Sequence, residues 1–283
     1  MTFRFLLLIG LSCIHCFANA SNLTLYINKG SLTIGTSFIS ACAFNADENL
    51  NTKSEIIELD VNEVINITVI NTDSLEHSFT IDGFIDSNNA IAPFQTEVFS
   101  VSFPNPGTFR YYSDKSYGAN IGASGIFLIG FPNESHFFWN LFDLNKQLTH
   151  DFANLSETSY PADYLPELFF ISGTHYPFTL EDPQTKVVIN NGQSCIISVV
   201  NSGYMDHVLH FHGFHVEILS AQLAADRVGW SKDTIPLKKG EAMTFRLVAN
   251  QVGIYPVHDH NLIAVTNAGF YPGGMLTQIQ VLP

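Results

Sequence analysis

The second half of the chain repeats the residue pattern of the first half. When residues 56–84 are aligned with residues 186–214, which lie 130 positions later, six of the 29 pairs are identical and most others are similar in kind. Residues 106–114 correspond in the same way to 252–260, and each unit then closes with a glycine-rich turn and an apolar run. Repeat units of about a hundred residues are typical of a duplicated domain. The repeat therefore predicts two domains of one fold.

Short runs of alternating apolar and polar residues fill each unit. Residues 65–70 (INITVI) and 196–200 (IISVV) are typical of strands, and a turn that begins with Asn follows each of them. Glycine, proline and asparagine separate further runs of this kind, and no long stretch shows the period of a helix. The pattern predicts an all-β protein with a β-sandwich in each half.

The repeat and its interruptions suggest the domain boundaries. We expect a signal peptide over residues 1–20, a first domain over 21–131, a linker over 132–166 and a second domain over 167–283. The linker is predicted because Asn, Pro and a Phe-Phe-Trp cluster break the strand pattern there. A short helical piece is expected within 140–154, and the run LFFI at 168–171 is expected to open the second domain.

The N-terminus has the features of a secretory signal. One basic residue, Arg4, precedes an apolar run over 5–14 and the small-x-small sequence at 18–20 that signal peptidase cleaves. The run is too short to cross the roughly 30 Å core of a bilayer as a helix, and no later segment is apolar over ~20 residues. The sequence predicts an exported protein, periplasmic or secreted, without a membrane span.

The net charge and the cysteine content indicate which partners and which cysteine chemistry to expect. The formal net charge is −14 at pH 7, so nucleic acid, which is bound mainly through Lys and Arg, is not expected as a partner. Of the four cysteines, Cys13 and Cys16 lie in the signal. Cys42 and Cys195 lie in apolar runs of different halves, and we expect two buried free thiols, with a disulfide between them as the alternative.

Histidines gather in two short windows near the C-terminus. Six of the eleven lie there: His207, His210, His212 and His215 in the first window, and His258 and His260 in the second. Side chains two positions apart on a strand share a face, so each His-x-His pair projects together. If the two strands are neighbours, ~4.8 Å apart, four imidazoles converge on one patch. We therefore predict a metal site of His210, His212, His258 and His260; imidazole suits copper, zinc, iron and nickel.

Two segments resemble those of a known family. Residues 205–213 (MDHVLHFHG) resemble the His-x-x-His-x-His-Gly segment of multicopper oxidases, and residues 253–260 (GIYPVHDH) resemble their closing His-Cys-His segment. That family continues with Gly-Met, here Gly274-Met275. Residues 260–263 (HNLI) are similar to the strand of copper nitrite reductases that supplies a copper ligand from the second domain.

The resemblance covers most of residues 56–131 and 167–283. It implies two tandem cupredoxin-like Greek-key β-sandwich domains and copper as the cofactor. It also implies copper ions and a small reductant or oxyanion substrate as partners, and a homotrimer whose sites lie between subunits.

Departures from the family pattern change the expected chemistry. The cysteine that makes the blue type 1 copper in that family is Asp259 here, and the histidine five positions later is Ala264. A carboxylate cannot replace the thiolate that defines such a centre. We therefore expect a vacated type 1 site at His207, Asp259 and Met275. His207 and Asp259 are expected to form a buried pair, because a buried carboxylate needs a partner, and Met275 is expected to be a core residue.

The first domain has fewer possible ligands. The positions that match the four predicted ligands are occupied by Thr80, Asp82, Tyr112 and Asp114. The cysteine position is Ser113, and His77 alone matches a family histidine. The trinuclear cluster of multicopper oxidases and the catalytic copper of nitrite reductases both need first-domain histidines. The complete mechanism of neither family is therefore expected here.

Three functions are compatible with these residues. The first is a copper oxidoreductase that acts on small reductants, or on an oxygen or nitrogen species, without a relay copper. The second is a copper-binding or copper-handling protein that does not turn over. The third is a metal-free pseudo-enzyme that keeps the sandwich for protein contacts.

Copper loading should leave the protein nearly colourless. Because residue 259 is not a cysteine, no thiolate can give the intense charge-transfer band of a blue centre. We expect a type 2 copper resonance and only weak visible absorption, measured by electron paramagnetic resonance and absorption spectroscopy on the loaded protein. An intense blue band would contradict the assignment.

Overall fold

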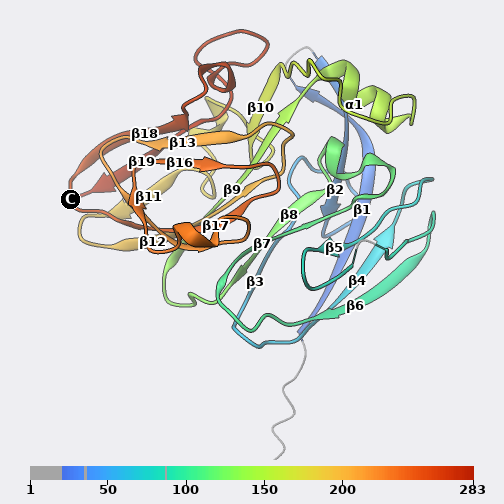
Figure 1. The fold of residues 1–283 in the computed structure, drawn as a ribbon, viewed down its shortest axis with the longest axis horizontal. Coiled ribbons are helices and arrows are strands. Elements are labelled where there is room, and N and C mark those ends of the chain that lie inside the picture. The colour runs from blue at the N-terminus through green and yellow to red at the C-terminus, as the bar shows by residue number, and fades with distance from the viewer. Residues whose placement is uncertain (1–20, 35–36, 87) are drawn as a thin grey trace, which may run out of the picture.

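A computed structural model describes residues 21–34, 37–86 and 88–283 as two β-sandwiches side by side (Figure 1). The expected signal peptide lies outside the described residues. The all-β expectation is confirmed, because four sheets account for most of the described structure. No helix among the described residues is long and apolar enough to cross a membrane.

The first sandwich contains two four-stranded sheets. In strand order, one sheet is made of β2 (Ser37–Asn45), β1 (Ser21–Ile34), β4 (Ile65–Asn71) and β6 (Thr96–Val101). The other is made of β3 (Ile56–Leu59), β8 (Ser124–Ile129), β7 (Gly107–Tyr112) and β5 (Thr80–Ile81). In β4 every second residue is buried, as the alternation of its sequence predicts. An aromatic core that includes Phe44, Phe79 and Phe127 fills the space between the sheets.

The second sandwich contains a six-stranded and a five-stranded sheet. The six-stranded sheet is made of β10 (Leu168–Ile171), β9 (Ser135–Leu144), β12 (Ser194–Asn201), β17 (Ala242–Val248), β14 (Val216–Ala221) and β15 (Ser231–Lys232). The five-stranded sheet is made of β11 (Val187–Asn190), β19 (Leu276–Leu282), β18 (Gly253–Asp259), β13 (His207–Phe211) and β16 (Thr234–Leu237).

The helical segments are short. The α-helix α1 (Lys146–Ala153) is preceded by Asn145, whose side chain accepts a hydrogen bond from the Leu148 amide as an N-cap. Five 3₁₀ turns complete the described structure: η1 (Lys115–Tyr117), η2 (Ala119–Ile121), η3 (Phe178–Leu180), η4 (Ala225–Arg227) and η5 (Leu262–Val265).

The sequence repeat corresponds to a repeat in topology. Strand β1 pairs antiparallel with β2 and parallel with β4, just as β9 pairs antiparallel with β10 and parallel with β12. Likewise β3 runs parallel to β8 as β11 runs parallel to β19. Strand β7 lies between β8 and β5 as β18 lies between β19 and β13. The two halves are therefore copies of one arrangement.

The linker expected over residues 132–166 is wrong in its first part. Residues 135–144 form β9, a strand inside the six-stranded sheet, so β10 is not the first strand of the second sandwich. The physical reason is that both faces of β9 are covered: Trp139 lies in the core of the second sandwich, and Phe138 packs against the first. A strand buried on both faces loses the alternation by which strands are recognised. The helix within the expected window is confirmed as α1.

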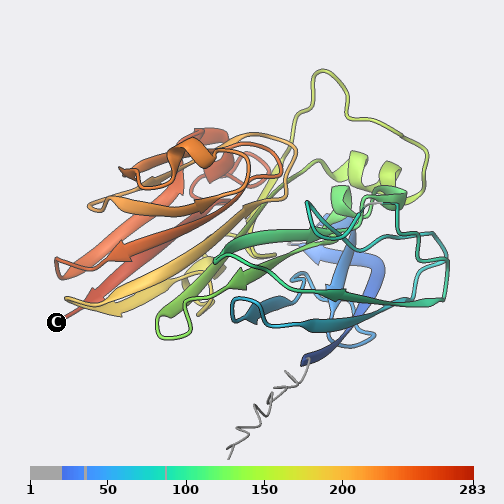
Figure 2. The ribbon, with the colours of Figure 1, turned by 60° about the horizontal axis from the view of Figure 1, so that its bottom comes forward.

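The two sandwiches pack sheet against sheet. Ile126 and Leu128 of β8 contact an apolar surface on the six-stranded sheet that includes Ile196 and Val200. Hydroxyl pairs cross the same junction, Thr108 Oγ1 with Thr244 Oγ1 at 2.8 Å and Ser124 Oγ with Ser202 Oγ at 2.7 Å. The four sheets are thus stacked in order, and the five-stranded sheet is the outer layer farthest from the first sandwich (Figure 2).

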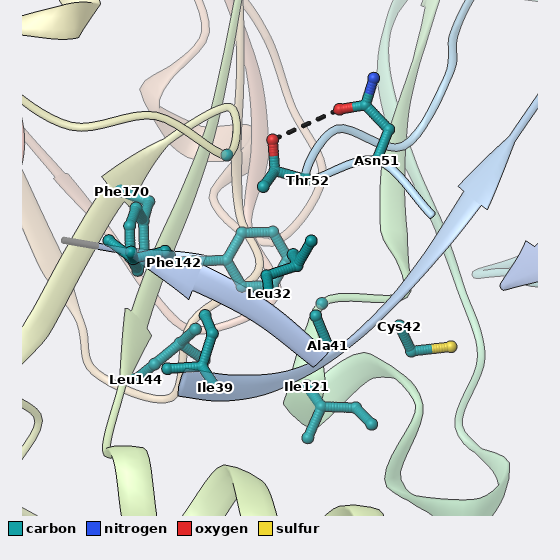
Figure 3. Close-up of a pocket in the computed structure, with 13 residues that line it drawn as sticks. Leu32, Ile39, Ala41, Cys42, Asn51, Thr52, Ile121, Phe142, Leu144 and Phe170 are labelled. Atoms are coloured by element: carbon teal, nitrogen blue, oxygen red, sulfur yellow. Dashed lines mark hydrogen bonds between the residues drawn. The ribbon is translucent and has the colours of Figure 1, made fainter. Parts of the chain in front are cut away.

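Two segments reach across the junction. The β1–β2 hairpin extends from the first sandwich, and its Leu32 and Ile39 lie beside Phe142, Leu144 and Phe170 of the second (Figure 3). In the other direction, α1, which lies between β9 and β10, packs its buried face into the core of the first sandwich. These residues leave a cavity of about 40 Å³ under the hairpin, mostly apolar in its lining.

Cys42 and Cys195 are both free and buried, as expected. Cys42 lies in the first sandwich and Cys195 in the core of the second. Burial raises the pKa of both thiols, Cys195 to about 12, so neither is a thiolate at neutral pH.

Candidate metal centre

Strands β13 and β18 bring the two histidine windows together. They are antiparallel neighbours in the five-stranded sheet, and His210 lies directly opposite His258. Leu209 and Phe211 point into the sandwich core, so His210 points outward by alternation. The Pro256 carbonyl accepts a hydrogen bond from the His212 amide, and the Val208 carbonyl accepts one from the His260 amide, which continues the pairing past both strand ends.

The four imidazoles form one cluster on the outer face of this sheet. The ring of His210 is central: its centroid lies 4.7 Å from that of His212, 5.7 Å from His258 and 5.6 Å from His260. The rings of His212 and His258 are 5.1 Å apart. His210 and His258 are half-buried, whereas His212 and His260 are exposed. The predicted convergence of the four side chains is therefore present.

Hydrogen bonds orient the rings. His258 Nδ1 lies 2.8 Å from the Asp259 carbonyl oxygen, which can only accept, so Nδ1 carries the proton and Nε2 has a free lone pair. His258 Nε2 faces His212 Nε2 at 3.0 Å. His210 Nδ1 lies 2.9 Å from Thr234 Oγ1. Burial, followed by the proximity of His210 and His258, lowers the pKa of His212, which favours the neutral form that metals bind.

The cluster is not closed around one centre. Within the described ranges, no set of three or more His, Cys, Asp or Glu side chains is arranged to hold a metal ion. The donor set nonetheless suits copper, since imidazole nitrogens are common copper ligands and two of them already face each other. The assignment of His210, His212, His258 and His260 as metal ligands stays a prediction.

Beneath this cluster, the residues of the expected vacated type 1 site form a buried polar network. His207 Nδ1 lies 2.5 Å from Asp259 Oδ2, as expected, and both side chains are fully buried. On the other side of the ring, His207 Nε2 lies 3.1 Å from Asp143 Oδ1. One imidazole is thus held between two carboxylates. Met275 is fully buried in the core of the second sandwich, also as expected.

The network carries charge inside the protein. Burial lowers the pKa of His207, but hydrogen bonds and charge interactions with Asp143 and Asp259 outweigh burial and raise it to about 9. The buried imidazolium donates one hydrogen bond to each carboxylate, whereas Asp143 Oδ2 is buried without a hydrogen-bond partner among the described residues. Asp259 Oδ1 also accepts from the Asn261 amide, and Asp143 Oδ1 from the Met205 amide. A glycine is required at position 203, because a Cβ on Gly203 would collide with Asp143 Oδ1.

Asp143 was missed by sequence reasoning. It lies at the end of β9, within the segment expected to be a linker. The only available signal was a single acidic residue inside an otherwise apolar run, NLFDL, at 140–144. A buried acid in such a run needs a partner, but the sequence does not say which one.

The first sandwich has a parallel arrangement with different residues. His77 Nδ1 lies 3.1 Å from Ser113 Oγ, at the position that matches Asp259, and His77 Nε2 lies 3.0 Å from Asp73 Oδ2. Tyr112 donates to Asp82 Oδ1 at 2.8 Å, and Ser78 donates to Asp114 Oδ1 at 2.5 Å. The duplicated scaffold thus keeps a buried histidine in each half, and only the second half has the outward histidines.

The histidine cluster faces away from the chain's own first sandwich. It lies on the outer sheet, while the first sandwich contacts the six-stranded sheet on the opposite side of the second core. Asp82, Tyr112 and Asp114 therefore do not join the cluster within one chain. Oxygen donors from a first sandwich could reach it only from another copy.

Comparison with known proteins agrees with the fold and the motifs. Residues 159–275 match the family model described as multicopper oxidase. No curated protein sequence matches the chain. Among solved structures, the blue copper oxidase from Nitrosomonas europaea is similar with a TM-score of 0.77 at 18% identity, over 93% of this chain and 86% of that one.

Two further structures are similar over nearly the whole chain. The copper nitrite reductase from Nitrosomonas europaea has a TM-score of 0.71 at 15% identity, over 93% of this chain and 94% of that one. The laccase from Botrytis aclada has a TM-score of 0.72 at 16% identity, over 92% of this chain and 52% of that one. The protein therefore has the two-domain cupredoxin-like fold, as the resemblance implied.

The buried imidazolium makes stability depend on pH. A histidine whose folded pKa, about 9, exceeds its unfolded value of 6.5 stabilises the fold fully below pH 6.5 and progressively less as pH rises to about 9. For the metal-free protein we expect the free energy of unfolding to fall by about 3 kcal/mol over this range. Urea denaturation at a series of pH values measures it, and His207→Gln should remove the slope. Equal slopes in both proteins would contradict the assigned charge.

Asp259 should be a structural residue and not a ligand. Asp259→Ala leaves His207 buried with one carboxylate partner, so we expect a loss of about 3 kcal/mol or more, with the copper stoichiometry unchanged. The exposed Asp226→Ala is the matched control and should leave stability within about 0.5 kcal/mol. A normal melting temperature with loss of copper would show instead that Asp259 binds the metal.

Proposed function

We propose that this protein is an exported copper oxidoreductase of two cupredoxin-like domains, with copper held by His210, His212, His258 and His260 and without a type 1 centre. The observation that carries the proposal is the meeting of four imidazoles on one outer face, with His212 Nε2 and His258 Nε2 3.0 Å apart. Because His258 Nε2 is unprotonated, His212 Nε2 donates a hydrogen bond to it in the metal-free chain. A cation that replaces this proton would be within reach of both nitrogens through bonds of about 2.0 Å.

The chain's own groups prepare the ligands. The Asp259 carbonyl fixes the tautomer of His258, and Thr234 Oγ1 contacts Nδ1 of His210, so that Nε2 of each ring is left for metal. Such outer partners orient ligands and tune their basicity. Copper bound by imidazole would supply one-electron transfer to or from a small molecule.

A blue centre does not fit the residues beneath. The thiolate position is Asp259, whose carboxylate is already bound to His207, and Met275 is packed in the core. The exposed position of His212 and His260 supports a substrate that is small and arrives from solvent, either a reductant or an oxyanion. The proteins of similar fold are described as copper oxidases and a copper nitrite reductase, which supports redox chemistry at copper.

A homotrimer is part of the proposal. The segment that follows His260 exposes four large apolar side chains: Leu262, Ile263, Phe270 and Tyr271, of which Phe270 is 79% exposed. Exposed apolar side chains gathered in one loop beside a polar site favour burial by a partner. A first sandwich of a second copy, with Asp82, Tyr112 and Asp114, would lie beside the histidines and supply oxygen donors.

A second function, copper handling without turnover, is favoured by a different observation. The electron-entry thiolate is missing from the second sandwich, and no cysteine is exposed within the described residues. A solvent-facing histidine cluster without a relay centre suits storage or delivery of copper. The third function is that of a metal-free pseudo-enzyme that makes protein contacts. Measuring the metal content of protein purified without added metal separates this function from the other two.

Copper should bind the four histidines as one site. We expect His210→Ala with His212→Ala, and separately His258→Ala with His260→Ala, to weaken copper binding by at least ~100-fold in calorimetric titration, more than a lost outer partner costs. The exposed pair His150→Ala with His215→Ala is the control and should bind like wild type. Affinity should also fall as pH drops through ~6.5, because protonated imidazole cannot ligate.

Wild-type affinity in either double variant would show two independent pairs and remove the main support for an oxidoreductase site. If the site stands, steady-state assays of the copper-loaded protein with small reductants under oxygen, and with nitrite, separate turnover from copper handling.

A further inference from the structure

The junction between the sandwiches contains two cations without carboxylate partners. The chain has 12 Lys and Arg against 26 Asp and Glu, so a basic group has many possible acidic partners. Nevertheless, neither Arg110 of β7 nor Lys239, in the turn between β16 and β17, is within ion-pair distance of a carboxylate in the described part of the chain. Both lie at the same place between the two halves.

The guanidinium of Arg110 is half-buried and only partly satisfied. Its Nε donates to Ser124 Oγ at 2.8 Å, and its Cζ lies 4.3 Å from the ring centroid of Tyr112. Among the described residues, neither of its two terminal nitrogens donates to a protein acceptor. A guanidinium has five N–H donors in a fixed fork, so four donors of Arg110 remain for another molecule. Burial lowers its pKa, but an arginine stays charged in proteins.

Lys239 comes from the other sandwich. Its Nζ lies 4.1 Å from the ring centroid of Tyr204 and 5.3 Å from that of Tyr160, and these two rings stack. The aromatic rings attract the ammonium but, unlike a carboxylate, do not neutralise its charge. In the turn that contains Lys238, Lys239 and Gly240, a Cβ at Gly240 would lie 3.8 Å from Arg110 Nη1. The turn therefore lies directly against the guanidinium.

A cavity opens at this contact. It has a volume of about 150 Å³ and is lined by residues of both sandwiches, among them Arg110, Gln222 and Gly240. Asp82 also lines it, but its Oδ1 accepts from the Tyr112 hydroxyl. The formal charges of the lining residues Arg110 and Asp82 cancel, and Lys239, next to the lining residue Gly240 in the same turn, adds a positive charge beside the cavity. Gln222 is fixed by donation from Nε2 to the Thr108 carbonyl.

We propose that Arg110 and Lys239 form a binding site for a small oxyanion, a carboxylate or a phosphate, at the junction of the two sandwiches. The free fork of Arg110 matches two oxygens of one anion, which is the strongest form of hydrogen bonding to such groups. Lys239 supplies the second charge from across the junction. The bound anion would connect the sandwiches electrostatically, and the site does not depend on copper binding.

The test is calorimetric titration of the metal-free full chain with inorganic phosphate, acetate or chloride at matched ionic strength. Titration at about pH 8, above the ordinary pKa of histidine near 6.5, limits the attraction of anions to protonated imidazole. We expect phosphate or acetate to bind measurably and chloride not to bind. The anion that binds more tightly identifies the source, a phosphate group or a carboxylate.

Variants assign the site. Arg110→Gln should weaken binding by ~10-fold or more, and Lys239→Gln, an exposed change that leaves the fold intact, by ~3-fold or more. Asp82→Asn should strengthen binding, because it removes a negative charge from the cavity wall. The neighbouring exposed Lys238→Gln is the control and should bind like wild type.

Equal effects of Lys238→Gln and Lys239→Gln would show general charge attraction and overturn the proposal. Equal heats for phosphate, acetate and chloride would overturn it as well. Because the copper titration uses other residues, failure here leaves the proposed function standing, and failure of copper binding leaves this site standing.

Discussion

The buried contact between His207 and Asp259 ties together the two strands that carry the outer histidine cluster. It joins β13 to β18 inside the sandwich, where the direct pairing of the two strands extends over only three residue pairs. Because side chains alternate along a strand, Asp259 points inward while its neighbours His258 and His260 lie on the outer side. Asp259 therefore links the two strands through its carboxylate and fixes the tautomer of His258 through its carbonyl.

Much of this arrangement could be predicted from the sequence. The repeat predicted two similar units, and the alternation of apolar and polar residues predicted strands. The His-x-His spacing predicted that the two histidines of each pair lie on one face of a strand. The inward direction of Asp259 followed from the same alternation. These are local properties, set by the period of two residues, and they do not depend on how distant segments pack.

The failures concern long-range packing. Strand β9 could not be recognised because apolar contacts cover both of its faces, and so Asp143 was not connected with His207. The direction of the histidine cluster relative to the first sandwich depends on which sheets meet at the junction. That choice follows from surfaces such as Ile126, Leu128 and Ile196, which look in sequence like any other core residues.

The reciprocal crossing of the junction has a mechanical meaning. The hairpin of β1 and β2 overlaps the second sandwich, and the equivalent connection between β9 and β10 returns α1 to the first. Each half thus clasps the other with the same element of the repeat, and the flat sheet-to-sheet contact lies between the two clasps. Contacts of the hairpin, of α1 and of the facing sheets together oppose hinge rotation of one sandwich relative to the other. An assembly that joins the outward histidines of one copy to first-half residues of another must therefore fit the relative orientation that these contacts favour.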